Sequence, residues 1–164
     1  MRRRFWIPLG GVVVALAVAA VLFEVLGGSG SPAAQPRARV YRDVTVCLLT
    51  DAHGRSGSQA AQVWAGMQDA SLAAHTQATS LAVVGPATVA NALPYVNTLL
   101  QQRCAVVLAA GAVQSAAVEQ VAAGSPKVRF VVTDGKATGA NVTVVAPSGD
   151  LRAEVTHLVR TLVH

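Results

Sequence analysis

Residues 44–67 read VTVCLLTDAHGRSGSQAAQVWAGM, and this stretch decides the expected fold. A run of mostly apolar and β-branched residues leads into Asp51, then a turn rich in Gly and Ser, then a helix-length segment. A parallel α/β domain builds a ligand site in this way, at the carboxyl end of its first strand. Arg55, serine hydroxyls and backbone N–H groups converge there, which favours small polar or anionic ligands. The same pattern also arises where a tight turn only requires glycine, so both interpretations stay open.

Apolar strand-like runs alternate with helix-length segments after this stretch. Strands are expected at 44–50, 80–84, 105–109, 128–133 and 141–145, and helices at 58–74, 88–102, 113–122 and 149–163. This alternation predicts an α/β fold, namely a three-layer, doubly wound, mainly parallel five-stranded sheet of order 2-1-3-4-5. Pro94 predicts a kink in the second helix or a start nearer Leu93. The last helix is amphipathic, and one face is expected to pack on the sheet through Leu151, Val155, Leu158, Val159 and Leu162.

The N-terminal part of the chain predicts a membrane anchor and a tether. Residues 1–4 read as a basic cytoplasmic tail, 5–26 as a transmembrane signal anchor, and 27–42 as a Gly/Ser/Pro-rich linker. The arginines ahead of the apolar run predict that residues 43–164 form an extracytoplasmic α/β domain of a single-pass cell-membrane protein. A signal peptide cleaved near 31–35 is the alternative.

Charge and composition argue against nucleic-acid binding and catalysis. Residues 1–43 hold six arginines against two acidic residues, a net of +4 out of the total +5, and the remainder has no basic stripe that could follow phosphates. Neither a nucleophile elbow nor a phosphate loop is present. Metal-ligand spacing is lacking at His53, His75, His157 and His164. We therefore expect no enzyme activity, no catalytic residues, no cofactor and no metal.

The two cysteines predict a disulfide. Cys47 and Cys104 fall in or at the start of the first and third strands, which are neighbours in a sheet of order 2-1-3-4-5. Neighbouring strands lie about 4.8 Å apart, and the Cα atoms of a disulfide commonly lie about 5.5 Å apart. Export supplies the oxidising compartment. Two buried free thiols are the alternative.

Several sequence features follow one another in a fixed order through most of residues 44–160. They are the strand ending Leu49-Thr50-Asp51, Ser58 six residues before Trp64-Ala65-Gly66, the strand before Gly111, the run PKVRFVVTD at 126–134, and Asn141-Val142. In this order they resemble the first lobe of the basic membrane lipoprotein family, the ABC-transporter substrate-binding proteins that include purine nucleoside receptors. The resemblance implies a lobe that binds a nucleoside or another small solute and works with an ABC-transporter permease or another envelope protein.

The candidate ligand site combines this resemblance with the expected strand ends. Asp51 and Asp134 would accept hydrogen bonds from ribose hydroxyls or similar groups at the carboxyl edge of the sheet. Additional hydroxyl or backbone donors would come from Ser56, Ser58 and Gly111. In the structural alternative, Asp51 only caps the following helix and Asp134 only shapes the turn before Gly135.

The chain also departs from the family pattern. Members carry a Ser-Phe-Asn run whose aromatic ring stacks on the base, whereas this chain has Ser58-Gln59-Ala60. A lipid-anchoring cysteine is missing, and the sequence covers only one wall of a two-lobed cleft. We therefore expect weak or no purine nucleoside binding. The alternatives are a ligand-free scaffold or regulatory interaction module of the cell envelope, and an inert truncated copy.

Overall fold

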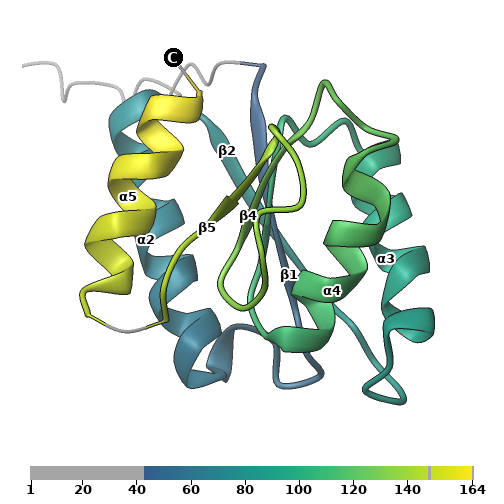
Figure 1. Cartoon of the computed structure of the whole chain (residues 1–164). Helices are drawn as coiled ribbons and strands as arrows, with labels where there is room; N and C mark the ends of the chain where they lie inside the picture. The colour runs from purple at the N-terminus through teal and green to yellow at the C-terminus, as the bar shows by residue number, and fades with distance from the viewer. Residues whose placement is uncertain (1–42, 148, 164) are drawn as a thin grey trace, which may run out of the picture. The chain divides into compact units, whose positions relative to one another are not determined.

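The computed structural model describes residues 43–147 and 149–163, which form a five-stranded parallel sheet with helices on both faces (Figure 1). The strand order is β2-β1-β3-β4-β5, so the predicted fold class and topology are confirmed. The strands are β1 Thr45–Thr50, β2 Gln77–Ala82, β3 Val106–Ala109, β4 Arg129–Val132 and β5 Val142–Val144. The helices are the 3-10 helix η1 Gly54–Ser56, α2 Ser58–Ala74, α3 Val89–Gln101, α4 Ala112–Ala122 and α5 Leu151–Leu162.

The expected cytoplasmic tail, membrane anchor and linker, residues 1–42, lie outside the described residues. Within residues 43–147 and 149–163, no helix combines the length and apolar character needed to cross a membrane.

Side-chain alternation along the strands builds two separate cores. The helices α2 and α5 cover one face of the sheet, and α3 and α4 cover the other (Figure 1). In β1, Val46 and Leu48 face the layer of α2 and α5, whereas Cys47 and Leu49 face the layer of α3 and α4. All four side chains are buried. A strand covered on both faces must be apolar at every position, which explains why its sequence reads as a continuous apolar run.

Two predicted boundaries differ from the structure. β2 begins at Gln77 instead of residue 80, because its backbone pairs in register with β1 from Thr45 onward even though its first residues are polar. Of the two alternatives predicted from Pro94, a start of the second helix near Leu93 is wrong, and the expected range 88–102 agrees with Val89–Gln101 to within one residue at each end. The helix begins at Val89 because the Thr88 hydroxyl accepts a hydrogen bond from the Asn91 N–H. It continues through Pro94, which is exposed.

The predicted disulfide between Cys47 and Cys104 is confirmed, with 5.9 Å between the two Cα atoms. It is not a pair of directly opposed residues, since the register places Val107 opposite Cys47. Cys104 instead lies just before β3. The bridge therefore joins the buried centre of β1 to the connection that follows α3, on the α3/α4 face of the sheet.

The last helix packs as predicted. Leu151, Val155 and Val159 are buried in the α2/α5 core, and Leu158 and Leu162 pack against it. The crossing of α2 and α5 depends on Gly66 of α2. A Cβ atom at that position would lie 2.6 Å from the Arg152 carbonyl oxygen and 2.9 Å from Val155 Cβ, so only glycine lets the helices approach this closely.

Candidate functional site

A pocket of about 300 Å³ lies at the carboxyl edge of the sheet, between the connections that follow β1 and β3. Its lining comprises Asp51, His53, Gly57, Ser58, Gln59, Ala60, Ala110 and Gly111. The chain after β1 passes to one face of the sheet as α2, and the chain after β3 passes to the other face as α4. Diverging connections open a crevice at this topological switch point, which is where ligands bind in open α/β sheets.

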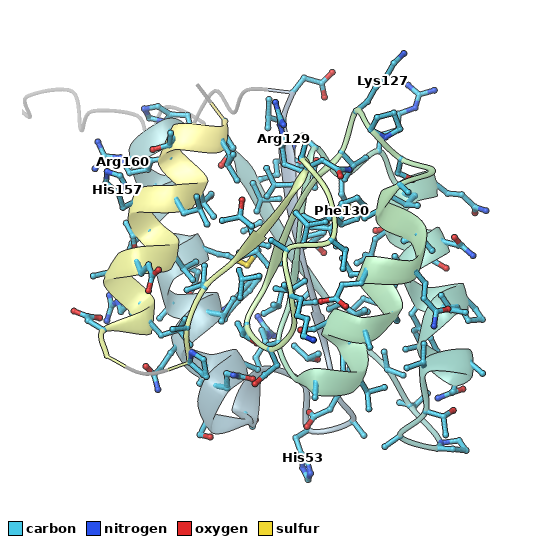
Figure 2. All side chains as sticks on the ribbon, viewed as in Figure 1. His53, Lys127, Arg129, Phe130, His157 and Arg160 are labelled. Carbon is cyan, nitrogen blue, oxygen red and sulfur yellow. A yellow bond between two sulfur atoms is a disulfide. The ribbon has the colours of Figure 1, made fainter. Side chains whose placement is uncertain are left out.

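Asp51 lies at the β1 side of the pocket, directly after the strand. Its Oδ1 accepts a hydrogen bond of 3.0 Å from the His53 N–H, and the Gly54 N–H donates to the Asp51 carbonyl oxygen. The side chain therefore stabilises the turn before η1 and does not cap α2. Figure 2 shows His53 at this end of the molecule, opposite the end that carries Lys127 and Arg129.

Asp134 belongs to a hydrogen-bond network that joins α2, β3, β4 and α4. Its Oδ2 accepts a hydrogen bond of 3.0 Å from Gln59 Nε2 and lies 3.2 Å from the Thr133 hydroxyl. The Asp134 N–H donates to Ser115 Oγ at 3.3 Å. The carboxylate is half-buried, and the network holds it against the N-terminal turn of α2.

Thr133 is the buried centre of this network. Its hydroxyl accepts a hydrogen bond of 3.2 Å from the Gly111 N–H and is placed to donate to either the Ala109 carbonyl or Asp134. A hydroxyl has one hydrogen, so it donates to one of these acceptors at a time. The network fixes the ends of β3 and β4 relative to each other beside the pocket.

The two helices that begin at the pocket have no side-chain cap. The N-caps of α2 and α4 are Gly57 and Gly111, whereas α3 and α5 are capped by Thr88 and Asp150. The first N–H groups of a helix lack partners within the helix and carry partial positive charge. The pocket therefore combines carboxylate acceptors with backbone donors.

The structure brings together most of the predicted site residues. Asp51, Ser58 and Gly111 line the pocket, and Asp134 adjoins it through Gln59. Ser56, in η1, does not line it. The expectation that the Gly111 backbone donates to a ligand needs correction, because its N–H is engaged by the Thr133 hydroxyl.

The roles of Gln59, Thr133 and Ser115 were not predicted from the sequence. Gln59 stands where the family pattern has an aromatic ring, so its position was recognisable although its bond to Asp134 was not. Thr133 precedes Asp134 in the PKVRFVVTD run. No sequence signal marks Ser115, because its contact comes from the packing of α4 on β4.

Two larger hollows lie away from this edge. One, of about 550 Å³, runs between α2 and β2 beside Trp64 and Leu72, and Arg55 lies 4.8 Å above the Trp64 ring. The other, of about 440 Å³, is lined by Asp69 of α2 and by α5 residues that include Arg152, His157 and Arg160. Figure 2 labels His157 and Arg160 on α5. Arg152 is paired there with Asp69 at 2.7 Å. Among residues 43–147 and 149–163, no group of His, Cys, Asp and Glu side chains is arranged to hold a metal ion.

Two solved structures share this fold. A fragment from Peptoclostridium difficile 630, described as a "putative lipoprotein", superimposes with a TM-score of 0.62 and 15% identity, covering 73% of this chain and 98% of that one. A transcriptional activator of the comK gene from Bacillus halodurans gives a TM-score of 0.52 and 16% identity, covering 61% of this chain and 33% of that one. At these identities the likeness establishes the fold alone. No protein-family model matches the chain, and no curated protein matches its sequence.

Proposed function

We propose that this chain is a membrane-anchored extracytoplasmic domain of the solute-binding type, and that its carboxyl-edge pocket binds a small, non-anionic solute bearing hydroxyl groups. The proposal rests on one observation. Each of the two strand-end aspartates has one oxygen held by a protein donor and a second oxygen with no hydrogen-bond partner among the described residues. Asp51 is held through Oδ1 and Asp134 through Oδ2. Each carboxylate is thus oriented and still has an oxygen that can accept.

The chemistry of the pocket favours hydroxyl groups over anionic groups. A carboxylate accepts hydrogen bonds and cannot donate them, so its natural partner is a solute O–H or N–H. Two carboxylates near one pocket repel an anion, which offsets the attraction of the uncapped helix ends for negative charge. A sugar or polyol satisfies both sets of groups, since each hydroxyl donates to a carboxylate and accepts from a backbone N–H.

Binding is expected to be weak. A pocket of about 300 Å³ is at the lower end of the range of about 300–1,000 Å³ for ligand sites, and it is partly open to solvent. The resemblance to purine nucleoside receptors suggests a ribose-like group. Gln59 supplies no aromatic face for a base, however, and stacking of that kind is worth about 1–3 kcal/mol. Millimolar dissociation constants are therefore expected.

The cellular location is part of the same proposal. The buried Cys47–Cys104 disulfide is typical of proteins that fold in an oxidising compartment. The apolar run at 5–26 supplies the proposed anchor, and the fold neighbour described as a lipoprotein is compatible with an envelope protein. An ABC-transporter permease is the proposed partner. Protection of residues 43–164 from external protease in intact spheroplasts would contradict this orientation.

Ligand-detected NMR on the full chain in detergent tests the solute proposal. The panel contains ribose, hexoses, polyols and purine nucleosides, and at least one hydroxylated solute should show saturation transfer. Asp51→Asn and Asp134→Asn should each reduce the signal several-fold, since an amide replaces the acceptor that the site requires. Asp69→Asn is the matched control, because Asp69 is a half-exposed carboxylate remote from this edge. Signals that are unchanged in both site variants would refute the proposed site.

A ligand-free interaction module is the second candidate function. The observation that favours it is the Gln59–Asp134 hydrogen bond, which occupies one carboxylate oxygen of the pocket. This candidate predicts no saturation transfer from any solute of the panel, in the native chain or in Gln59→Ala. A solute that binds only to Gln59→Ala would show that Gln59 blocks a site inherited with the fold.

A further inference from the structure

Within residues 43–147 and 149–163, β2 forms an edge of the sheet that lacks the usual protection against pairing. It pairs with β1 alone among the described strands. Its sequence, QATSLA, contains no charged residue and no proline, and the following Val83 and Val84 are also uncharged. Monomeric proteins commonly protect an edge with Lys, Pro, a bulge or a very short strand. The opposite edge, β5, follows that rule because it has only three residues.

The unpaired backbone groups of β2 can be assigned from the parallel ladder. Gln77 N–H donates to the Val44 carbonyl and Val83 N–H to the Thr50 carbonyl, so the odd-numbered positions face β1. Because successive backbone groups of a strand point in opposite directions, the N–H and C=O groups of Ala78, Ser80 and Ala82 face outward. All three residues have small, half-exposed side chains. A second strand can therefore approach without steric obstruction from β2.

Exposed apolar side chains lie at both ends of this edge. Leu72 is 56% exposed and lines the hollow between α2 and the amino end of β2, together with Trp64 and Ala78. Val84 is 59% exposed and follows the carboxyl end of β2. The remaining exposed large apolar residue of the described chain is Val144, at 37%. Exposed apolar side chains are thus concentrated next to β2.

We propose that β2 pairs with β2 of a second copy of this chain, in antiparallel orientation, to form a continuous ten-stranded sheet about a twofold axis at Ser80. In this register Ser80 lies opposite Ser80 of the second copy, and Ala78 lies opposite Ala82. All the outward backbone groups of these three residues are then paired. An isologous contact of this kind needs only one self-complementary surface.

The twofold axis also explains the positions of the apolar side chains. Antiparallel pairing brings the carboxyl end of one β2 next to the amino end of the other. Val84 of each copy thereby reaches the hollow that contains Leu72 and Trp64 of the other copy. Leu72 of α2 lies beside the amino end of β2, and Val84 follows its carboxyl end, so antiparallel pairing of two copies brings Val84 of one copy towards Leu72 of the other.

Anchoring in one membrane is compatible with this arrangement. The described chain begins next to β1, which is the direct neighbour of β2. In the proposed dimer, the β1 strands of the two copies therefore lie on either side of the paired β2 strands. At about 3.4 Å per residue, the residues of the proposed linker at 27–42 could span at most about 50 Å, whereas a six-residue strand is about 20 Å long. Both copies can therefore reach the same bilayer.

Cross-linking of the full chain in its native membrane tests the register. Ser80→Cys places two thiols on residues whose Cα atoms are expected to lie about 5.5 Å apart, within disulfide range. The new thiol is the only free one, because both native cysteines are bridged. Mild oxidation should convert most of this variant to a covalent dimer. Thr143→Cys, exposed on the opposite edge strand, is the matched control and should stay monomeric.

Charge substitutions at the same position test the symmetry. Ser80→Lys and Ser80→Glu each place like charges opposite each other and should weaken self-association about fivefold to tenfold. A mixture of the two variants, carrying different affinity tags, should recover co-purification to at least the native level. This recovery separates loss of the interface from misfolding, since misfolded chains would not associate when mixed.

Three results would overturn the inference. They are cross-linking of Thr143→Cys but not of Ser80→Cys, a native chain that stays monomeric in detergent at all concentrations, and a Lys/Glu mixture that associates no better than either variant alone. A photo-crosslinker at position 80 that captures a different protein in place of a second copy would assign this edge to a foreign strand. That result would also overturn it. None of these tests depends on whether the carboxyl-edge pocket binds a solute.

Discussion

Gln59 Nε2 donates a 3.0 Å hydrogen bond to Asp134 Oδ2, joining residues that lie 75 positions apart in the sequence. The bond connects the first turn of α2 to the end of β4 across the switch point of the sheet. It holds one carboxylate oxygen of the candidate site and leaves the other oxygen available. The state of the pocket, open or blocked, therefore depends on this pair.

Gln59→Glu should destabilise the domain at neutral pH. Two carboxylates at this distance repel by about 1 kcal/mol when exposed to water. Because of this repulsion, the folded pair binds a proton at a higher pH than the unfolded chain does. The deficit in the free energy of unfolding is therefore complete at pH 7 and disappears as the pH falls towards about 4. Urea unfolding at several pH values measures it. The control is Gln62→Glu, at an exposed position of α2, and a pH-independent deficit would contradict the interpretation.

Replacing both bridged cysteines, Cys47→Ala with Cys104→Ala, should lower the free energy of unfolding. The bridge spans 57 positions, for which the chain-entropy model gives about 4 kcal/mol. Alanine avoids burying a new polar group at these buried positions. Denaturant unfolding of the native and doubly substituted chains measures the loss, and the native chain under reducing conditions should resemble the variant. Two alkylatable thiols in the unreduced, denatured native protein would show that the bridge does not form.

Gly66→Ala should destabilise the domain although alanine favours helices. The added methyl group would meet the Arg152 carbonyl and Val155 at distances that force α2 and α5 apart. Overpacking of this kind typically costs about 1–3 kcal/mol, more than the gain of about 1 kcal/mol in helix propensity. Thermal unfolding measures the difference. A Gly66→Ala variant as stable as the native chain would show that the helices do not cross as closely as described.

Asp69 should titrate below its usual pKa of 3.8, because its carboxylate accepts hydrogen bonds from the Arg152 guanidinium at 2.7 and 3.0 Å. The same pair raises the pKa of Arg152. Since the pKa of Asp69 is lowered in the folded chain, the contribution of the pair to stability is present above the unfolded pKa and is lost as the pH falls through the folded value.

NMR titration of the carboxylate carbons measures this pKa, and Arg152→Gln should return it towards 3.8. Arg160→Gln is the control, because Arg160 is an exposed cation of the same helix that makes no contact with Asp69 among the described ion pairs. An Asp69 pKa that does not change in Arg152→Gln would contradict the assigned cause.

The sequence by itself determined the sheet order, the two helix layers and the disulfide partners. Buried parallel strands must be apolar on both faces, as in Val46-Cys47-Leu48-Leu49, and an amphipathic helix such as α5 shows its buried face at a fixed spacing. These signals are local and periodic. The strand ends also placed Asp51 and Asp134 at the correct edge.

Only the tertiary structure decided what those aspartates contact and which surfaces lie open. The Gln59–Asp134 bond, the capture of the Gly111 N–H by Thr133, and the close approach at Gly66 join segments whose separation in the sequence carries no periodic signal. β2 was misplaced for a related reason. Its polar first residues are held by pairing with β1 and not by their own propensity, and its outer edge is defined only by its position in the sheet.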